Sequence, residues 1–193
     1  MATAPVPAPA DVNVRALDAA EARARVAELS DVLLDCVEGG ASVSFMAPLT
    51  RARADAFWHG VADGVEAADR VLLAAEDGGR LVGTVQVVFA WPENQPHRGD
   101  VAKMLVARAA RRRGVGERLM RAAEDAARAA GRTLLVLDTV TGSDAERLYA
   151  RLGWVRVGSV PDYALWPDGR PCATTFFYRQ LAPTPPWTTP PAS

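Results

Sequence analysis

Residues 101–137 restrict the architectures open to this chain more than any other segment. They contain a short strand from Val101 to Val106, a turn rich in arginine and glycine, a helix from about Val115 to Ala130, and an apolar run from Thr133 to Leu137. An unbroken apolar run is typical of a strand that is buried on both faces. Two strands joined through a helix are expected to be parallel neighbours with a right-handed crossover. The segment therefore predicts the centre of a sheet that is at least partly parallel.

The flanking segments add further helices and strands. Helices are predicted for Asp18–Glu38, Thr50–Ala68 and a segment that starts at Ser143, where Glu146 completes a capping box. Further strands are predicted around Val12 and Val14, at Val71–Glu76 and Leu81–Trp91 in a hairpin, and at Trp154–Val160 and Cys172–Leu181. This order indicates an α/β (α+β) fold, with a central mixed β-sheet of about seven strands and helices on both faces.

Composition limits the class of protein. The 193 residues predict a single domain at 11–181, with a disordered segment at 1–10 and a Pro-rich disordered tail at 182–193. A formal net charge of -1 argues against nucleic acid or an anionic membrane as a partner. The two cysteines lack the spacing of a zinc site, so no metal is expected. Without a long apolar segment or a signal peptide, the expected location is cytoplasmic.

The turn Arg111–Gly116 is the strongest candidate for a binding site. It reads Arg-Arg-Arg-Gly-Val-Gly and lies between a strand and a helix. Glycines allow backbone N–H groups to converge, and a helix N-terminus adds unpaired N–H groups, so the turn suits a pyrophosphate. A Walker A loop is excluded because no Gly-Lys-Ser/Thr string occurs, whereas a Rossmann site is only weakened by Leu119 in place of a third glycine. A tight turn with solvated arginines remains the structural alternative.

Two motifs together resemble a known family. Arg111, Gly114 and Gly116 match the R-x-x-G-x-G motif of the GNAT superfamily of N-acetyltransferases, and the helix 145–154 resembles its A-x-x-L-Y-x-x-x-G-[FW] segment. A narrower resemblance, to the tabtoxin-resistance acetyltransferases, rests on the strings 38–46, 137–139 and 161–169. Those enzymes acetylate an amino-acid-like toxin.

The GNAT resemblance implies a mechanism. Acetyl-CoA would be the co-substrate. Its pantetheine arm would pair with a strand edge where the two parallel central strands splay apart. A main-chain N–H there would stabilise the oxyanion that forms when the amine attacks the thioester carbonyl. The cofactor-binding residues implied are Met104, Leu105, Val106, Arg111, Arg112, Arg113, Gly114, Val115 and Gly116. Tyr149 occupies the position of the family's general acid, although a tyrosine on an apolar helix face also suits a core.

The acceptor side is less specified. Asp138 is predicted to end the strand 133–137, where it would bind or deprotonate the acceptor amine, or else cap the following turn. The loops 41–48, 92–99 and 161–171 are expected to shape the pocket. Alternation along the strand predicts Lys103 on the face opposite Ala102 and Met104, and assigns it no role.

Three functions therefore compete: transfer to a small-molecule amine, which includes a toxin or antibiotic; transfer to a peptide or protein; and non-catalytic acyl-CoA binding. A homodimer is also expected, because GNAT enzymes often dimerise.

Overall fold

The computed structural model describes residues 12–181, so both segments predicted to be disordered, 1–10 and 182–193, lie outside the described residues. Seven strands form one mixed sheet in the order β1-β2-β3-β4-β5-β7-β6, in which β4 and β5 are parallel. The strands are β1 (Asn13–Leu17), β2 (Arg70–Asp77), β3 (Arg80–Phe89), β4 (Arg98–Val106), β5 (Leu134–Val140), β6 (Val155–Leu165) and β7 (Pro171–Gln180). The predicted fold class is confirmed.

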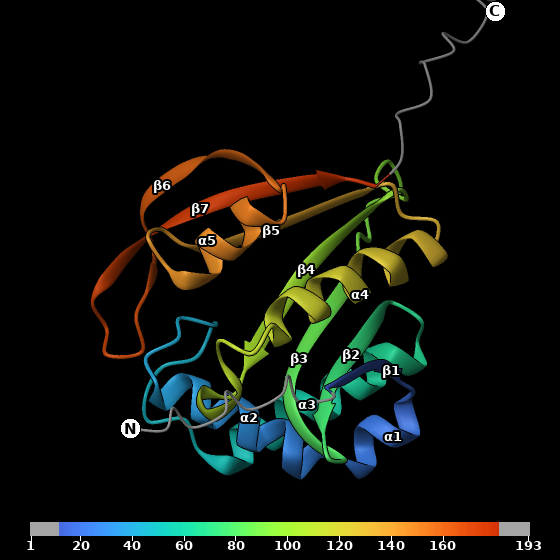
Figure 1. The fold of residues 1–193 in the computed structure, drawn as a ribbon, viewed down its shortest axis with the longest axis vertical. Helices are drawn as coiled ribbons and strands as arrows, with labels where there is room; N and C mark the ends of the chain where they lie inside the picture. Colours follow the sequence, from blue (N-terminus) through green and yellow to red (C-terminus); the bar gives the residue numbers. More distant parts are fainter. Residues whose placement is uncertain (1–11, 182–193) are drawn as a thin grey trace, which may run out of the picture.

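Helices cover both faces of this sheet (Figure 1). They are α1 (Ala19–Ala24), α2 (Val26–Glu38), α3 (Arg51–Glu66), α4 (Val115–Ala129) and α5 (Asp144–Arg151), with a short 3-10 turn at Arg108–Ala110. One core lies between the sheet and α1, α2 and α3, around Trp58 and Leu105. A second core lies between the sheet and α4 and α5, around Leu119 and Phe177. The two faces of the sheet therefore belong to two separate hydrophobic layers.

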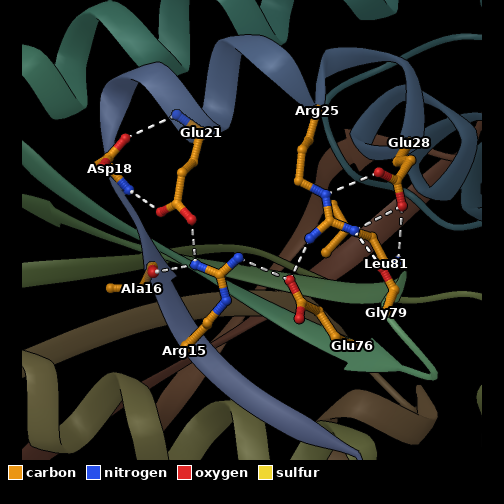
Figure 2. A network of polar contacts seen from close by, with 9 residues as sticks. All are labelled: Arg15, Ala16, Asp18, Glu21, Arg25, Glu28, Glu76, Gly79 and Leu81. Carbon is orange, nitrogen blue, oxygen red and sulfur yellow. Dashed lines mark hydrogen bonds and ion pairs between the residues drawn. The ribbon is translucent and has the colours of Figure 1, made fainter.

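The prediction of one helix over Asp18–Glu38 is wrong, because the helix breaks at Arg25 between α1 and α2. The Arg25 side chain donates to Glu28 at 2.8 Å and to the Gly79 carbonyl at 2.8 Å, and it also pairs with Glu76 (Figure 2). Arg15 reaches the same Glu76 carboxylate at 3.1 Å. Glu76 is therefore held in an ion-pair network that joins β1, α2 and the β2–β3 hairpin, and it does not lie in a solvated turn.

The buried face of α4 follows a spacing of four residues. Val115, Leu119, Ala123 and Ala127 are buried, whereas Ala126 is only partly buried. Met120 and Glu124 are also buried, and the Glu124 carboxylate accepts a hydrogen bond from Trp154 Nε1 at 3.2 Å. A spacing of four residues keeps a stripe in line along a helix, which favours Ala127 over Ala126.

Two strands, β5 and β6, extend further along the chain than predicted. β6 runs through the residues 161–165 that were predicted as loop, with register shifts on both sides of Gly158–Val160, so the connection to β7 is only 166–170. Pro161 is tolerated because β6 is the edge strand of the sheet. β5 likewise continues to Val140, since each added residue pairs with β7.

Candidate active site

The two central parallel strands separate soon after they begin. β4 and β5 pair only between Arg98–Asp100 and Leu134–Val136, after which β4 stays with β3 and β5 stays with β7. Figure 1 shows the two strands diverging from their shared end. The edge of β4 beyond Asp100 has no partner in β5, so its main-chain groups on that side are available to a bound chain.

The arginine–glycine turn sits at the end of the diverging β4. Arg112 and Gly114 both adopt left-handed backbone conformations, with φ of 59° and 78°. Gly114 is the N-cap residue of α4 and supplies no side chain to the unpaired N–H groups of the first turn. Left-handed residues alternating with others along a turn point successive N–H groups toward one concave side. The local backbone therefore has the character of an anion-binding site.

The second glycine has a different function in the structure. A Cβ on Gly116 would lie 3.0 Å from Leu148 Cδ2, 3.8 Å from Met104 Sδ and 3.9 Å from Val106 Cγ2. The missing side chain therefore lets the start of α4 approach β4 and α5 closely. A Cβ on Gly114 would meet no atom within 4 Å, so glycine is favoured there by its backbone angle alone.

The three arginines are not equivalent. Arg111 donates from Nε to the Val106 carbonyl at 3.2 Å, which holds its guanidinium near the end of β4. Arg113 pairs with Asp77 at 2.7 Å, so part of its charge is offset, while Arg112 is exposed. An open hollow of about 550 Å³ adjoins Gly114 and is bordered by Arg113, Arg118 and Arg121. Glu117 and Asp125 border the same hollow, and Arg121 pairs with Glu117 at 3.5 Å, so the charge of these arginines is partly offset.

Tyr149 lies on α5 beside the opening between β4 and β5. Ser143 is the N-cap residue of α5, and its hydroxyl accepts from the Glu146 N–H at 3.1 Å. The predicted capping box is incomplete, because the Glu146 carboxylate accepts from the Gly142 N–H and not from the Ser143 N–H. The Tyr149 ring is buried between Trp154 and Phe177, with centroids 6.2 and 6.1 Å away. Its hydroxyl makes no hydrogen bond with the residues described. Burial, together with the charge of Asp138, raises the Tyr149 pKa well above its ordinary value.

Asp138 does not end its strand as predicted. It lies inside β5 opposite Phe176 of β7, because Thr139 and Val140 extend the pairing with Thr175 and Thr174. Its side chain is exposed at the opening, yet neighbouring atoms displace enough water that desolvation raises its pKa, an effect that Lys103 opposes. Asp138 is thus close enough to influence both Tyr149 and Lys103 electrostatically.

Lys103 is a residue of the site that sequence reasoning left without a role and placed on the wrong face relative to Ala102. β4 carries an extra residue between the pairs Ala102–Gln86 and Leu105–Thr84, and Lys103 takes a φ of 49° there. The bulge brings Lys103 Nζ to 3.1 Å from Ser44 Oγ and 5.8 Å from the centre of the Phe57 ring. Nothing in the local sequence marks this bulge, because it depends on the register with β3.

The expected pocket loops are only partly placed at the opening. Loop 41–48 lies there. It is fixed to the end of β6 by Ser42 Oγ donating to the Leu165 carbonyl at 2.7 Å, and to the β6–β7 connection by the Ala47 N–H donating to the Pro167 carbonyl at 3.0 Å. The segment 92–97 precedes β4, and the His97 carbonyl accepts from the Thr133 N–H at 2.8 Å. This segment therefore lies at the end where β4 and β5 are paired. The prediction that this loop shapes the opening is therefore wrong.

Solved structures share this architecture. The yncA protein of Salmonella typhimurium, solved with its cofactor acetyl-CoA, has a TM-score of 0.75 and 19% identity over 93% of this chain and 99% of its own. A ribosomal-protein-alanine N-acetyltransferase from Brucella melitensis has a TM-score of 0.74 and 20% identity, covering 87% of this chain and 99% of its own. At these identities the likeness shows a common fold.

Sequence comparison identifies the family. An N-acetyltransferase of uncharacterised function from Azospirillum brasilense, from the hisH–hisA intergenic region, is 29% identical over 167 residues, which are 82% of this chain and 97% of that protein. The model of the acetyltransferase (GNAT) family matches residues 16–154. The chain therefore belongs to the acetyltransferase (GNAT) family. The matched range contains the divergent strands, the arginine–glycine turn and Tyr149.

Proposed function

We propose that this protein transfers an acetyl group from acetyl-CoA to the primary amine of a small molecule, by direct attack while both substrates are bound. The observation that carries the proposal is the opening between β4 and β5, which has an anion-binding turn at one side and the Asp138–Lys103 pair at the other. Such an opening can hold a donor and an acceptor together, which supplies much of the rate of a two-substrate reaction.

The residues present fit acetyl-CoA. The left-handed turn 112–114 suits a pyrophosphate, and glycine at 116 lets the start of α4, which carries this turn, pack closely beside Met104 and Val106 of β4. Main-chain groups of Leu105 and Val106 would pair with the pantetheine arm, and a main-chain N–H of this stretch would stabilise negative charge on the carbonyl oxygen. Acetyl-CoA supplies the activated acyl group; binding and orientation come from the protein.

Tyr149 and Asp138 are proposed to handle protons. The Tyr149 hydroxyl is protonated at neutral pH even at the ordinary tyrosine pKa, so it can donate a proton to the departing thiolate as negative charge develops beside it. Asp138 attracts the acceptor's ammonium group and passes its proton to water. Because a salt bridge stabilises the ammonium form, Asp138 contributes to binding at least as much as to deprotonation.

The position of loop 41–48 favours a small acceptor over a peptide. Two hydrogen bonds fix this loop to the end of β6 and to the β6–β7 connection. This bridge narrows the access that an extended peptide would need. The narrower assignment to the tabtoxin-resistance type, with a toxin or antibiotic as one acceptor, is part of the same proposal and rests on the sequence strings alone. A cytoplasmic location is proposed separately, from the lack of a long apolar segment or signal peptide in the sequence.

The test is the release of CoA thiol from acetyl-CoA in the presence of small primary amines, polyamines and short peptides. The acceptor-free rate controls for hydrolysis. We expect acceleration by at least one small amine, with the acetylated product identified by mass spectrometry. Acceleration by peptides alone would refute the choice of acceptor class, and binding of acetyl-CoA without acceleration by any amine would refute the transferase assignment.

A further inference from the structure

The bulge in β4 changes the face on which Lys103 lies. Ala102 pairs with Gln86, and the neighbouring pair of Val101 with Val87 belongs to the α4 side of the sheet, so Ala102 faces α2 and α3. Strict alternation would then turn Lys103 back toward α4. The contacts with Ser44 and Phe57 place its ammonium on the α3 side instead. Bulges that re-aim a side chain are concentrated near functional sites.

The Lys103 ammonium is left without a direct ionic partner. Its one hydrogen bond within residues 12–181 is to a neutral hydroxyl, Ser44 Oγ, and no carboxylate there lies within 4.0 Å of Nζ. Burial lowers the Lys103 pKa, and the charge of Asp138 acts in the opposite direction. The two groups therefore influence each other across the opening without forming an ion pair.

We infer that Lys103 binds an anionic group of the acceptor, and that the acceptor is a small molecule carrying both a primary amine and a carboxylate, phosphonate or similar oxyanion. The inference rests on the proposed function. The acceptor's ammonium would face Asp138 and its anion would face Lys103, so each partly desolvated protein charge gains an opposite partner. The Ser44 hydroxyl provides a second hydrogen-bond donor for the same anion.

The energetics favour this arrangement over a purely structural lysine. A partly buried ammonium without a counter-charge is costly, and so is the left-handed backbone at a residue that is not glycine. Contacts within the fold offset these costs only in part, because Thr84 Oγ1 donates to the Lys103 carbonyl at 3.1 Å while the ammonium meets one neutral hydroxyl and the Phe57 ring and, among the described residues, no carboxylate. An anionic ligand offsets the cost of the unpaired charge when it binds.

The experiment compares amines of similar size with and without the anion, and each rate is expressed per unprotonated amine because the anion also raises the pKa of the amine. One set pairs free L-α-amino acids with their α-carboxamides, and a second pairs aminoalkyl phosphonates with the corresponding amino alcohols. The ratio of kcat/KM for the anionic over the neutral member is measured by thiol release for the wild type, Lys103→Met and Lys103→Arg. Both variants place a long, unbranched side chain at the left-handed position, so they differ chiefly in charge.

We expect the wild type to prefer the anionic member by roughly 10- to 100-fold, as for hydrogen bonds to charged groups. Lys103→Met should abolish this preference, and Lys103→Arg should retain part of it, with acetyl-CoA affinity similar in the two variants. Equal use of anionic and neutral amines by the wild type, or an unchanged preference in Lys103→Met, overturns the inference and leaves the proposed function standing. Absence of transfer to any amine is the separate result that overturns the proposed function itself.

Discussion

Substitutions at Gly114 can separate the charge of the proposed pyrophosphate site from its shape. Gly114→Asp and Gly114→Asn add side chains of nearly equal size at a position where a Cβ meets no atom within 4 Å. Asn and Asp both tolerate the left-handed backbone that Gly114 adopts, with φ of 78°. The two variants therefore carry similar strain and differ mainly by one negative charge beside the anion site.

The expected difference follows from Coulomb's law. Gly114 is exposed, so a dielectric near that of water applies, and two unit charges 4 Å apart interact by about 1 kcal/mol. A pyrophosphate carries about two unit charges, so the Asp variant should bind acetyl-CoA about 2 kcal/mol more weakly than the Asn variant, which is about 30-fold in Kd. The difference should shrink as salt is added, because the charges are exposed to solvent.

Stability should change in the opposite direction. Gly114 is the N-cap residue of α4, where a negative charge stabilises the helix by about 0.3–1 kcal/mol. The Asp variant should therefore be at least as stable as the Asn variant in denaturant unfolding, while isothermal calorimetry shows it to bind more weakly. Equal Kd values for the two variants at low salt would mean that no pyrophosphate lies at this turn.

Three further predictions concern single groups. Tyr149→Phe should preserve the ring packing and the unfolding temperature but slow the chemical step by roughly 10²- to 10⁴-fold, and full activity in single-turnover kinetics would make Tyr149 a core residue only. Asp138→Asn should raise KM for the acceptor if Asp138 binds the ammonium, or lower kcat if it moves a proton; unchanged constants with retained acetyl-CoA affinity would exclude both roles. Glu28→Gln should reduce the free energy of unfolding at pH 7 but not at acidic pH. The hydrogen bond from Arg25 lowers the pKa of Glu28 in the folded protein. The stabilisation that the Glu28 carboxylate gives is therefore fully present above the unfolded-state pKa of about 4.3 and is lost as pH falls through the folded-state pKa. A difference in unfolding free energy between wild type and Glu28→Gln that does not change with pH would contradict this.

The sequence was sufficient for features that are encoded locally. Glycine at position 114 follows from a backbone angle, and the spacing from Ser143 to Glu146 marks the start of α5. The helix register that places Tyr149 inward follows from local periodicity in the same way. These features depend on residues close in the chain, so a reader of the sequence can infer them without knowing which strands are neighbours.

Features that depend on strand pairing were missed. The position of Asp138 within β5 is set by its partners in β7, and the extent of β6 is set by the same strand. Arg25, at the break between α1 and α2, binds Glu76, which lies 51 residues away in the chain. Lys103 was placed on the wrong face relative to Ala102 because a bulge is a property of two strands, and the sequence of β4 alone reads as a regular strand.

The bulge also explains how one strand can serve two substrates in the proposed reaction. Met104 and Val106 point toward Gly116 and α4, on the side of the anion-binding turn, while Leu105 belongs to the core beside α2 and α3. A regular strand would direct Lys103 into the α4 layer, where its ammonium would compete for the space beside Gly116. With the extra residue, β4 keeps Met104 and Val106 on the donor side and turns Lys103, its only cation between Gly99 and Val106, toward the acceptor side. The position of the Lys103 ammonium on the acceptor side thus follows from a one-residue change in register. The Lys103→Met and Lys103→Arg variants test whether that ammonium selects an anionic acceptor.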